Sequence, residues 1–106
     1  MRSLILIVAL LTYAPTSQAT LVNTIGSGAT SSCGTWLDRR QQEQWFDMGN
    51  WALGYISGAA TFGAIGNPLE NTDAYGVAYW LDNYWRSQPS GYFVDAVKAF
   101  IHAHQQ

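Results

Sequence analysis

Two histidines near the end of the chain, His102 and His104, are of the residue type that most often binds a transition metal. They are two positions apart, and side chains at that spacing on a helix point about 200° away from each other. They therefore cannot share one ion, and no cysteine or carboxylate cluster accompanies them. The sequence predicts neither a metal site nor a cofactor.

Asp73 and Asp82 could be read as the paired carboxylates of an acid–base enzyme. They are nine positions apart, which places them about 180° apart around a helix. We expect Asp73 to cap that helix, and Asp82 to pair with Arg86 four positions later. A catalytic thiol at Cys33 would need a histidine base, and both histidines lie at the far C-terminus. The sequence therefore favours a protein that is not an enzyme.

The beginning of the chain, residues 1–19, has the composition of a secretory signal peptide. Met1-Arg2-Ser3 is basic, residues 4–11 are apolar, and Ser17-Gln18-Ala19 resembles a cleavage site. Cleavage after Ala19 would leave residues 20–106, which suffice for one modest core. The expected location is the periplasm or the outside of the cell. With 5 basic against 7 acidic side chains and no basic patch, nucleic acid is not an expected partner.

The stretch 45–66 is predicted to form a central helix, because apolar side chains recur along it at intervals of three and four. This stripe includes Trp51. The polar arc is narrow, and such a helix has neighbours on most sides. An interior glycine costs a helix about 1 kcal/mol relative to alanine. We therefore expect Gly54 and Gly58 to be points of close contact with other helices.

The same region raises the alternative of a transmembrane helix, because the span 48–69 carries no charged side chain until Glu70. Two of its glycines also have the spacing of a small-residue interface between membrane helices. Against this, three polar side chains lie in line along it, and Leu, Ile and Val are few. A water-soluble helix is the favoured interpretation, and membrane association is not expected.

Three further helices complete the prediction of an all-α fold, a compact bundle of about four helices in one domain, residues 33–106. Thr35 followed by Asp38 matches a capping box and predicts a helix from Trp36. Caps at 71–73 predict a helix reaching about residue 87, and Ser90 is the expected cap of the last helix. Residues 20–32 are small and polar without a period, and we expect a flexible lead-in there.

The helix after residue 73 has two different sides. Trp80 and Trp85 lie on its apolar arc and are expected to be structural. Tyr75, Tyr79 and Asp82 share its outer side, where they have no role in the core. Aromatic side chains with a nearby charge are typical of binding hot spots. These three residues are the candidate partner-binding site.

Five pieces of the chain, in this order and at this spacing, resemble a known family. They are Cys33-Gly34-Thr35-Trp36-Leu37, Trp51–Gly58, Thr72-Asp73-Ala74 with Gly76, Trp80-Leu81-Asp82-Asn83-Tyr84, and Asp95-Ala96-Val97. The pattern is similar to that of the small periplasmic helical proteins grouped with the immunity proteins of type VI secretion amidase toxins. Those proteins are in turn similar to the HdeA-type acid-stress chaperones. The resemblance runs from Cys33 to about His104, and it implies an HdeA-like helical fold.

The resemblance also implies a disulfide between the first and third helices, which this chain cannot form. The position of the second cysteine is occupied by Trp85. A bridge closing such a loop would contribute about 4 kcal/mol by chain entropy, so packing or association has to replace it. An odd cysteine in an exported protein indicates a free thiol or an intermolecular bridge. Cys33 is therefore expected to be unpaired or to join two copies of the chain.

The resemblance implies that the protein binds another protein and catalyses no reaction. An immunity protein sits on the active-site cleft of a toxin, whereas an HdeA-type chaperone loosens in acid and coats unfolded chains. A third reading remains open from the residues themselves. Exposed rings such as Tyr75 and Tyr79 could stack on sugars, as in a module that binds cell-wall sugars. We expect an immunity or inhibitor-type protein, with the chaperone and the sugar-binding module as alternatives.

Overall fold

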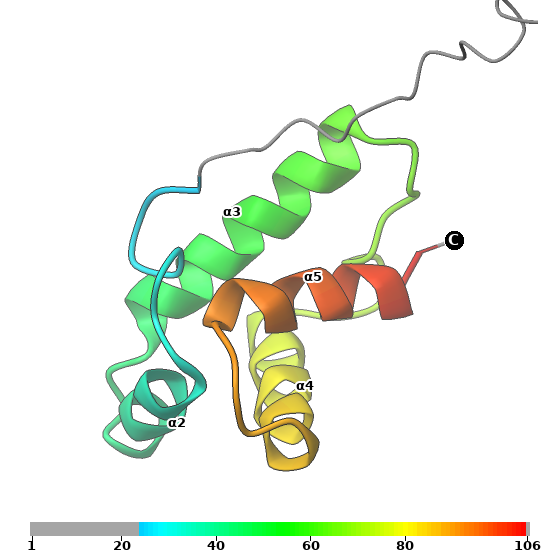
Figure 1. The fold of residues 1–106 in the computed structure, drawn as a ribbon. Coiled ribbons are helices and arrows are strands. Elements are labelled where there is room, and N and C mark those ends of the chain that lie inside the picture. The colour runs from blue at the N-terminus through cyan, green and yellow to red at the C-terminus, as the bar shows by residue number, and fades with distance from the viewer. Residues whose placement is uncertain (1–23, 106) are drawn as a thin grey trace, which may run out of the picture.

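The computed structural model describes residues 24–105, which form four helices and no strand (Figure 1). The helices are α2 (Cys33–Gln41), α3 (Phe46–Phe62), α4 (Ala74–Ser87) and α5 (Phe93–Ala103). The last three pack against one another, with α5 lying across the other two. The prediction of an all-α bundle of about four helices is confirmed. The predicted signal peptide, residues 1–19, lies outside the described residues.

The first described helix, α2, begins three residues earlier than expected. Its N-cap is Ser32, whose hydroxyl accepts a hydrogen bond from the Thr35 backbone N–H at 3.2 Å. The expected cap at Thr35 is therefore wrong, because an equally suitable hydroxyl precedes it by one turn. A turn at residues 42–45 separates α2 from α3, with Glu43 in the left-handed region at φ 60°. The two helices are thus distinct elements.

The central helix, α3, is 17 residues long and ends at Phe62, four residues before the predicted end. Its buried side is formed by Met48, Ala52 and Ile56. This side is rotated from the predicted stripe, since Trp51 lies at its margin and is only half-buried. Small and aliphatic side chains, rather than the largest rings, face the other helices. Among the described residues, no helix has both the length and the apolar character needed to cross a bilayer.

The helices α4 and α5 supply much of the core. Asp73 caps α4 by accepting the Gly76 N–H at 2.8 Å. The cap of α5 is Tyr92 and not the expected Ser90, and its N–H donates to the Asp95 carboxylate at 3.2 Å. The largest fully buried side chains come from all four helices: Trp36, Met48, Ile56, Leu81, Trp85, Phe93, Val97 and Phe100.

Residues 24–32, the described part of the chain before α2, contain no helix, yet they are attached to the domain. The indole N–H of Trp51 donates to the Ile25 carbonyl at 2.8 Å, and the Phe93 N–H donates to the Ser31 carbonyl at 2.7 Å. A Cβ atom at Gly28 would overlap the indole ring of Trp51. Only glycine permits this approach of the backbone to the ring. These contacts join residues 24–32 to the helical domain, which the expected boundary at Cys33 left out.

Candidate functional site

An exposed aromatic surface lies where α4 meets the start of α3. Tyr75 and Tyr79 are 64% and 63% exposed, and they stand four positions apart on one side of α4. The ring of Tyr75 contacts the edge of the buried Trp45 at 5.7 Å between ring centres. Phe46, also exposed, packs on Trp45 from α3 at 4.7 Å. We call Phe46, Tyr75 and Tyr79 the aromatic surface.

The third residue of the predicted binding site, Asp82, does not lie on this surface. It is only 8% exposed, and its carboxylate accepts hydrogen bonds from the Trp36 indole at 2.9 Å and from Arg40. Arg40 holds the carboxylate with two nitrogens, at distances of 2.8 and 3.1 Å. The expected pair with Arg86 is wrong, since Arg86 donates to Asn83 instead. Asp82 therefore ties α4 to α2 and is not free for a partner.

A sequence signal for this tie exists, although it is not local. Trp36 and Arg40 are four positions apart on α2 and so share one of its sides. The indole N–H of a buried tryptophan needs an acceptor, and a buried carboxylate needs a cation. Asp82 satisfies both requirements at once. Neither requirement identifies which acid of the chain does so, because Trp36 and Asp82 are 46 positions apart.

The electrostatic environment of Arg40 connects the buried tie to the aromatic surface. The hydrogen bond to Asp82 raises the pKa of the Arg40 guanidinium, which stays charged. The same guanidinium lies over the ring of Trp45, 4.8 Å from its centre. Trp45 in turn contacts Tyr75 and Phe46. The aromatic surface is thus supported from below by a charged and hydrogen-bonded network.

A polar hollow of about 400 Å³ lies beside this network, between α2 and α4. Arg40 and Asp82 form its floor, and its exposed rim carries charges of both signs, from Glu43 and Arg86. On α4 the spacing of Tyr79, Asp82 and Arg86 places the hollow on the same side of the helix as the aromatic surface. Exposed rings and charges of both signs therefore lie on one side of α4.

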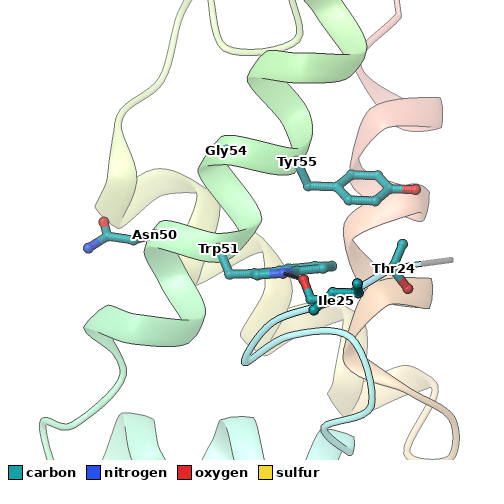
Figure 2. Close-up of a pocket in the computed structure, with 6 residues that line it drawn as sticks. All are labelled: Thr24, Ile25, Asn50, Trp51, Gly54 and Tyr55. Carbon is teal, nitrogen blue, oxygen red and sulfur yellow. Dashed lines mark hydrogen bonds between the residues drawn. The ribbon is translucent and has the colours of Figure 1, made fainter.

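A second hollow, of about 330 Å³, lies on α3 (Figure 2). Trp51 and Tyr55 point to the same side of the helix, toward Ile25, while the Asn50 side chain points to the other side. The remaining lining residues are Thr24 and Gly54. Trp51 and Tyr55 pack on each other at 5.3 Å between ring centres. This hollow is more apolar than the one between α2 and α4.

The expected helix contacts at Gly54 and Gly58 are wrong, because a Cβ atom at either position would have no neighbouring atom within 4 Å. The glycine of α3 that does make a close contact is Gly49, whose Cβ would lie 2.8 Å from the Trp45 ring. The approach to Trp51 comes instead from Gly26 and Gly28, in a segment without helical periodicity. No sequence pattern marked that segment as a neighbour of α3.

Of the remaining residues considered in the sequence, Trp80 and His104 pack against other rings of the domain. Trp80 is half-buried, with Tyr84 stacked on it at 5.6 Å and the ring of Phe100 edge-on at 5.3 Å. His104 also packs on Trp80, and its Nδ1 lies 2.7 Å from the Phe100 carbonyl oxygen. His102 is exposed. Within residues 24–105, no three side chains of His, Cys, Asp or Glu are grouped to hold a metal ion.

Cys33 is a free cysteine in the first turn of α2, and it is 3% exposed. Burial raises the pKa of its thiol, which disfavours the reactive thiolate. A disulfide between two copies through Cys33 would require the thiol to be uncovered first. Trp85, at the position of the missing cysteine, is fully buried in the core, and its indole N–H has no hydrogen-bond partner among the described residues.

Comparison of the chain with protein-family models, with curated proteins and with solved structures finds no match. The resemblance to periplasmic immunity proteins therefore rests on the five sequence pieces named above. That resemblance and the surface chemistry of α2, α3 and α4 are the two observations that bear on the function of this chain.

Proposed function

We propose that this protein is a non-catalytic, exported protein-binding domain of the immunity or inhibitor type. It binds a partner protein in the periplasm or outside the cell and blocks it. The observation that carries the proposal is the aromatic surface, with Tyr75 and Tyr79 each exposing nearly two-thirds of their area. Single exposed rings are common on proteins. A group of three beside a charged hollow is the composition of a binding hot spot.

The support beneath the aromatic surface favours an inhibitor over a loosely binding domain. Arg40 contacts both Asp82 and Trp45, so that α2, α4 and the start of α3 are held in one arrangement. A surface that is already ordered loses little conformational entropy when it binds. Tight occlusion of a cleft needs such a surface, because no covalent step contributes to affinity.

The sequence resemblance adds the class of partner to this argument. Its members bind another protein in the periplasm, and the predicted signal peptide of residues 1–19 would deliver this chain to the same compartment. A toxin-type enzyme is therefore the partner that we propose. Asp82 supports the surface from inside, and Phe46 joins Tyr75 and Tyr79 as the proposed contact residues.

The test is capture of a partner from periplasmic extract at neutral pH by the purified protein. We expect one stoichiometric partner, with affinity lowered by about 30-fold or more in the Tyr75→Ala, Tyr79→Ala double variant. The matched control is Tyr92→Ala, which removes an equally exposed tyrosine from the start of α5. Equal loss in the control, or retention in the double variant, would refute a role for the aromatic surface.

One observation favours the chaperone as the second candidate. The tie between α2 and α4 is an ion pair with its hydrogen bonds, so the loss of this one contact would loosen the domain, as an HdeA-type chaperone does. Capture repeated near pH 3 tests this reading. Binding of many unfolded proteins in acid alone would replace the inhibitor proposal with the chaperone. Binding to cell-wall sugars without a protein partner would replace it with the sugar-binding module.

A further inference from the structure

The outer side of α3 carries three features that its own domain leaves unused. Gly54 and Gly58 face open space, although interior glycines weaken a helix relative to alanine. Phe62, in the last turn, is 92% exposed. The apolar hollow beside Trp51 is open, with the exposed Ile25 at its edge. Open glycines, a protruding ring and an apolar hollow on one helix are characteristic of a contact surface.

These features face the same direction. Phe62 follows Trp51 by eleven positions, which is a rotation of only about 20° on an α-helix. Gly58 falls between them at a similar angle. The hollow is centred on the turn from Asn50 to Tyr55, so Phe62 lies about 14 Å farther along the helix axis. The protruding Phe62 ring and the apolar hollow therefore lie on the same side of α3, one after the other along its axis.

A two-fold axis would bring the protrusion of one copy onto the hollow of another. In a two-fold contact the same surface is used by both subunits, so residue i meets residue j and j meets i. The midpoint between Phe62 and the hollow falls near Gly58. There the two helices would cross, and the open glycines allow their backbones to approach closely.

We propose that a second copy of this chain docks antiparallel on this side of α3, with the Phe62 ring of each copy in the hollow of the other. The charges on α3 are compatible with this occupant. The only charged residue of the helix is Asp47, and in the antiparallel pair the two Asp47 side chains would be about 30 Å apart. Antiparallel helices also place opposite ends of their dipoles together.

The inference does not depend on the proposed function, because the aromatic surface lies on α4 and the turn before α3. It also differs from dimerisation through Cys33, which is buried in α2. The hollow is 330 Å³, enough for one phenyl ring, and its lining of Ile25, Trp51 and Tyr55 matches an aromatic guest.

Sedimentation of the purified protein over about 1 to 500 μM, with a reductant present to exclude disulfides, measures the association. We expect a reversible dimer whose Kd rises by about 30-fold or more in Phe62→Ser and in Gly54→Leu. The first variant removes the protrusion, and the second fills the hollow. Both positions are open in the single copy, so folding is retained. Tyr92→Ser is the control, since it removes an exposed ring from the start of α5.

Cross-linking tests the two-fold geometry separately. In the proposed pair a cysteine introduced as Gly58→Cys lies near the axis and forms a disulfide with its counterpart under mild oxidation. Lys98→Cys, exposed on α5, does not. A protein that stays monomeric throughout, or a dimer indifferent to Phe62→Ser, would overturn the proposal. Monomers in which residues 20–23 are protected from hydrogen exchange would show instead that the chain covers its own hollow.

Discussion

Two exposed aromatic regions of this protein differ in what lies beneath them. The aromatic surface of Phe46, Tyr75 and Tyr79 is supported by a partly buried ion pair and a cation over a ring. The outer side of α3 has apolar and uncharged polar side chains and open glycines, with a single charge at one end. The first region carries rings and both signs of charge, which suits the different protein that we propose as its partner, whereas the second is neutral, which suits the proposed second copy of the chain. Exposed rings alone thus do not identify a partner, and the groups behind them separate the two cases.

The strongest test of this difference is removal of the charge at Asp82. Asp82→Asn leaves Arg40 partly buried without its counterion, and we expect a loss of about 2–4 kcal/mol in the free energy of unfolding. Denaturant titration measures it. Arg86→Ala, on the exposed part of the same helix, should stay within about 0.5 kcal/mol of the wild type. A loss below about 1 kcal/mol for Asp82→Asn would make the tie no stronger than a surface ion pair.

The next test concerns the segment before α2, which covers one margin of α3. In Gly28→Ala the new Cβ overlaps the Trp51 ring, and overpacking of this kind costs about 1–3 kcal/mol. The matched control is Gly34→Ala on α2, where the nearest atom to the new Cβ is the Ser32 hydroxyl oxygen at 3.8 Å. In thermal melts we expect the melting temperature to fall in Gly28→Ala and to fall less, or to rise, in Gly34→Ala. Equal melting temperatures would mean that Trp51 does not depend on this segment.

The smallest expected effect separates two glycines of one helix. At a concentration where the protein is monomeric, Gly58→Ala should stabilise it by up to about 1 kcal/mol, because the site is open and alanine favours the helix. Gly49→Ala should destabilise it, since its Cβ would lie 2.8 Å from the Trp45 ring. Denaturation curves at low concentration give both values. Destabilisation by Gly58→Ala would place an unseen neighbour on that side of α3.

The parts of the fold that could be predicted from the sequence are those with local causes. The cap at Asp73, the end of α4 at Ser87 and the exposure of Tyr75 and Tyr79 all follow from spacing within one helix. The pairing of Asp82 with α2 and the covering of Trp51 depend on residues far away in the chain. Helical periodicity contains no information about such contacts, and it therefore predicts only the local partner, Arg86, for Asp82.

The hydrogen bond from Phe93 to Ser31 has a consequence for how the chain matures. A backbone bridge between Ser32 and Tyr92 lies next to it, so the residues at the start of α2 are bonded to the residues at the start of α5. The residues at the start of α2 therefore lack these hydrogen-bond partners until synthesis has passed residue 93. Contacts between such distant parts form slowly. A nascent chain would consequently remain incompletely folded through most of its synthesis, because a chain that ends before residue 93 has neither of these two contacts.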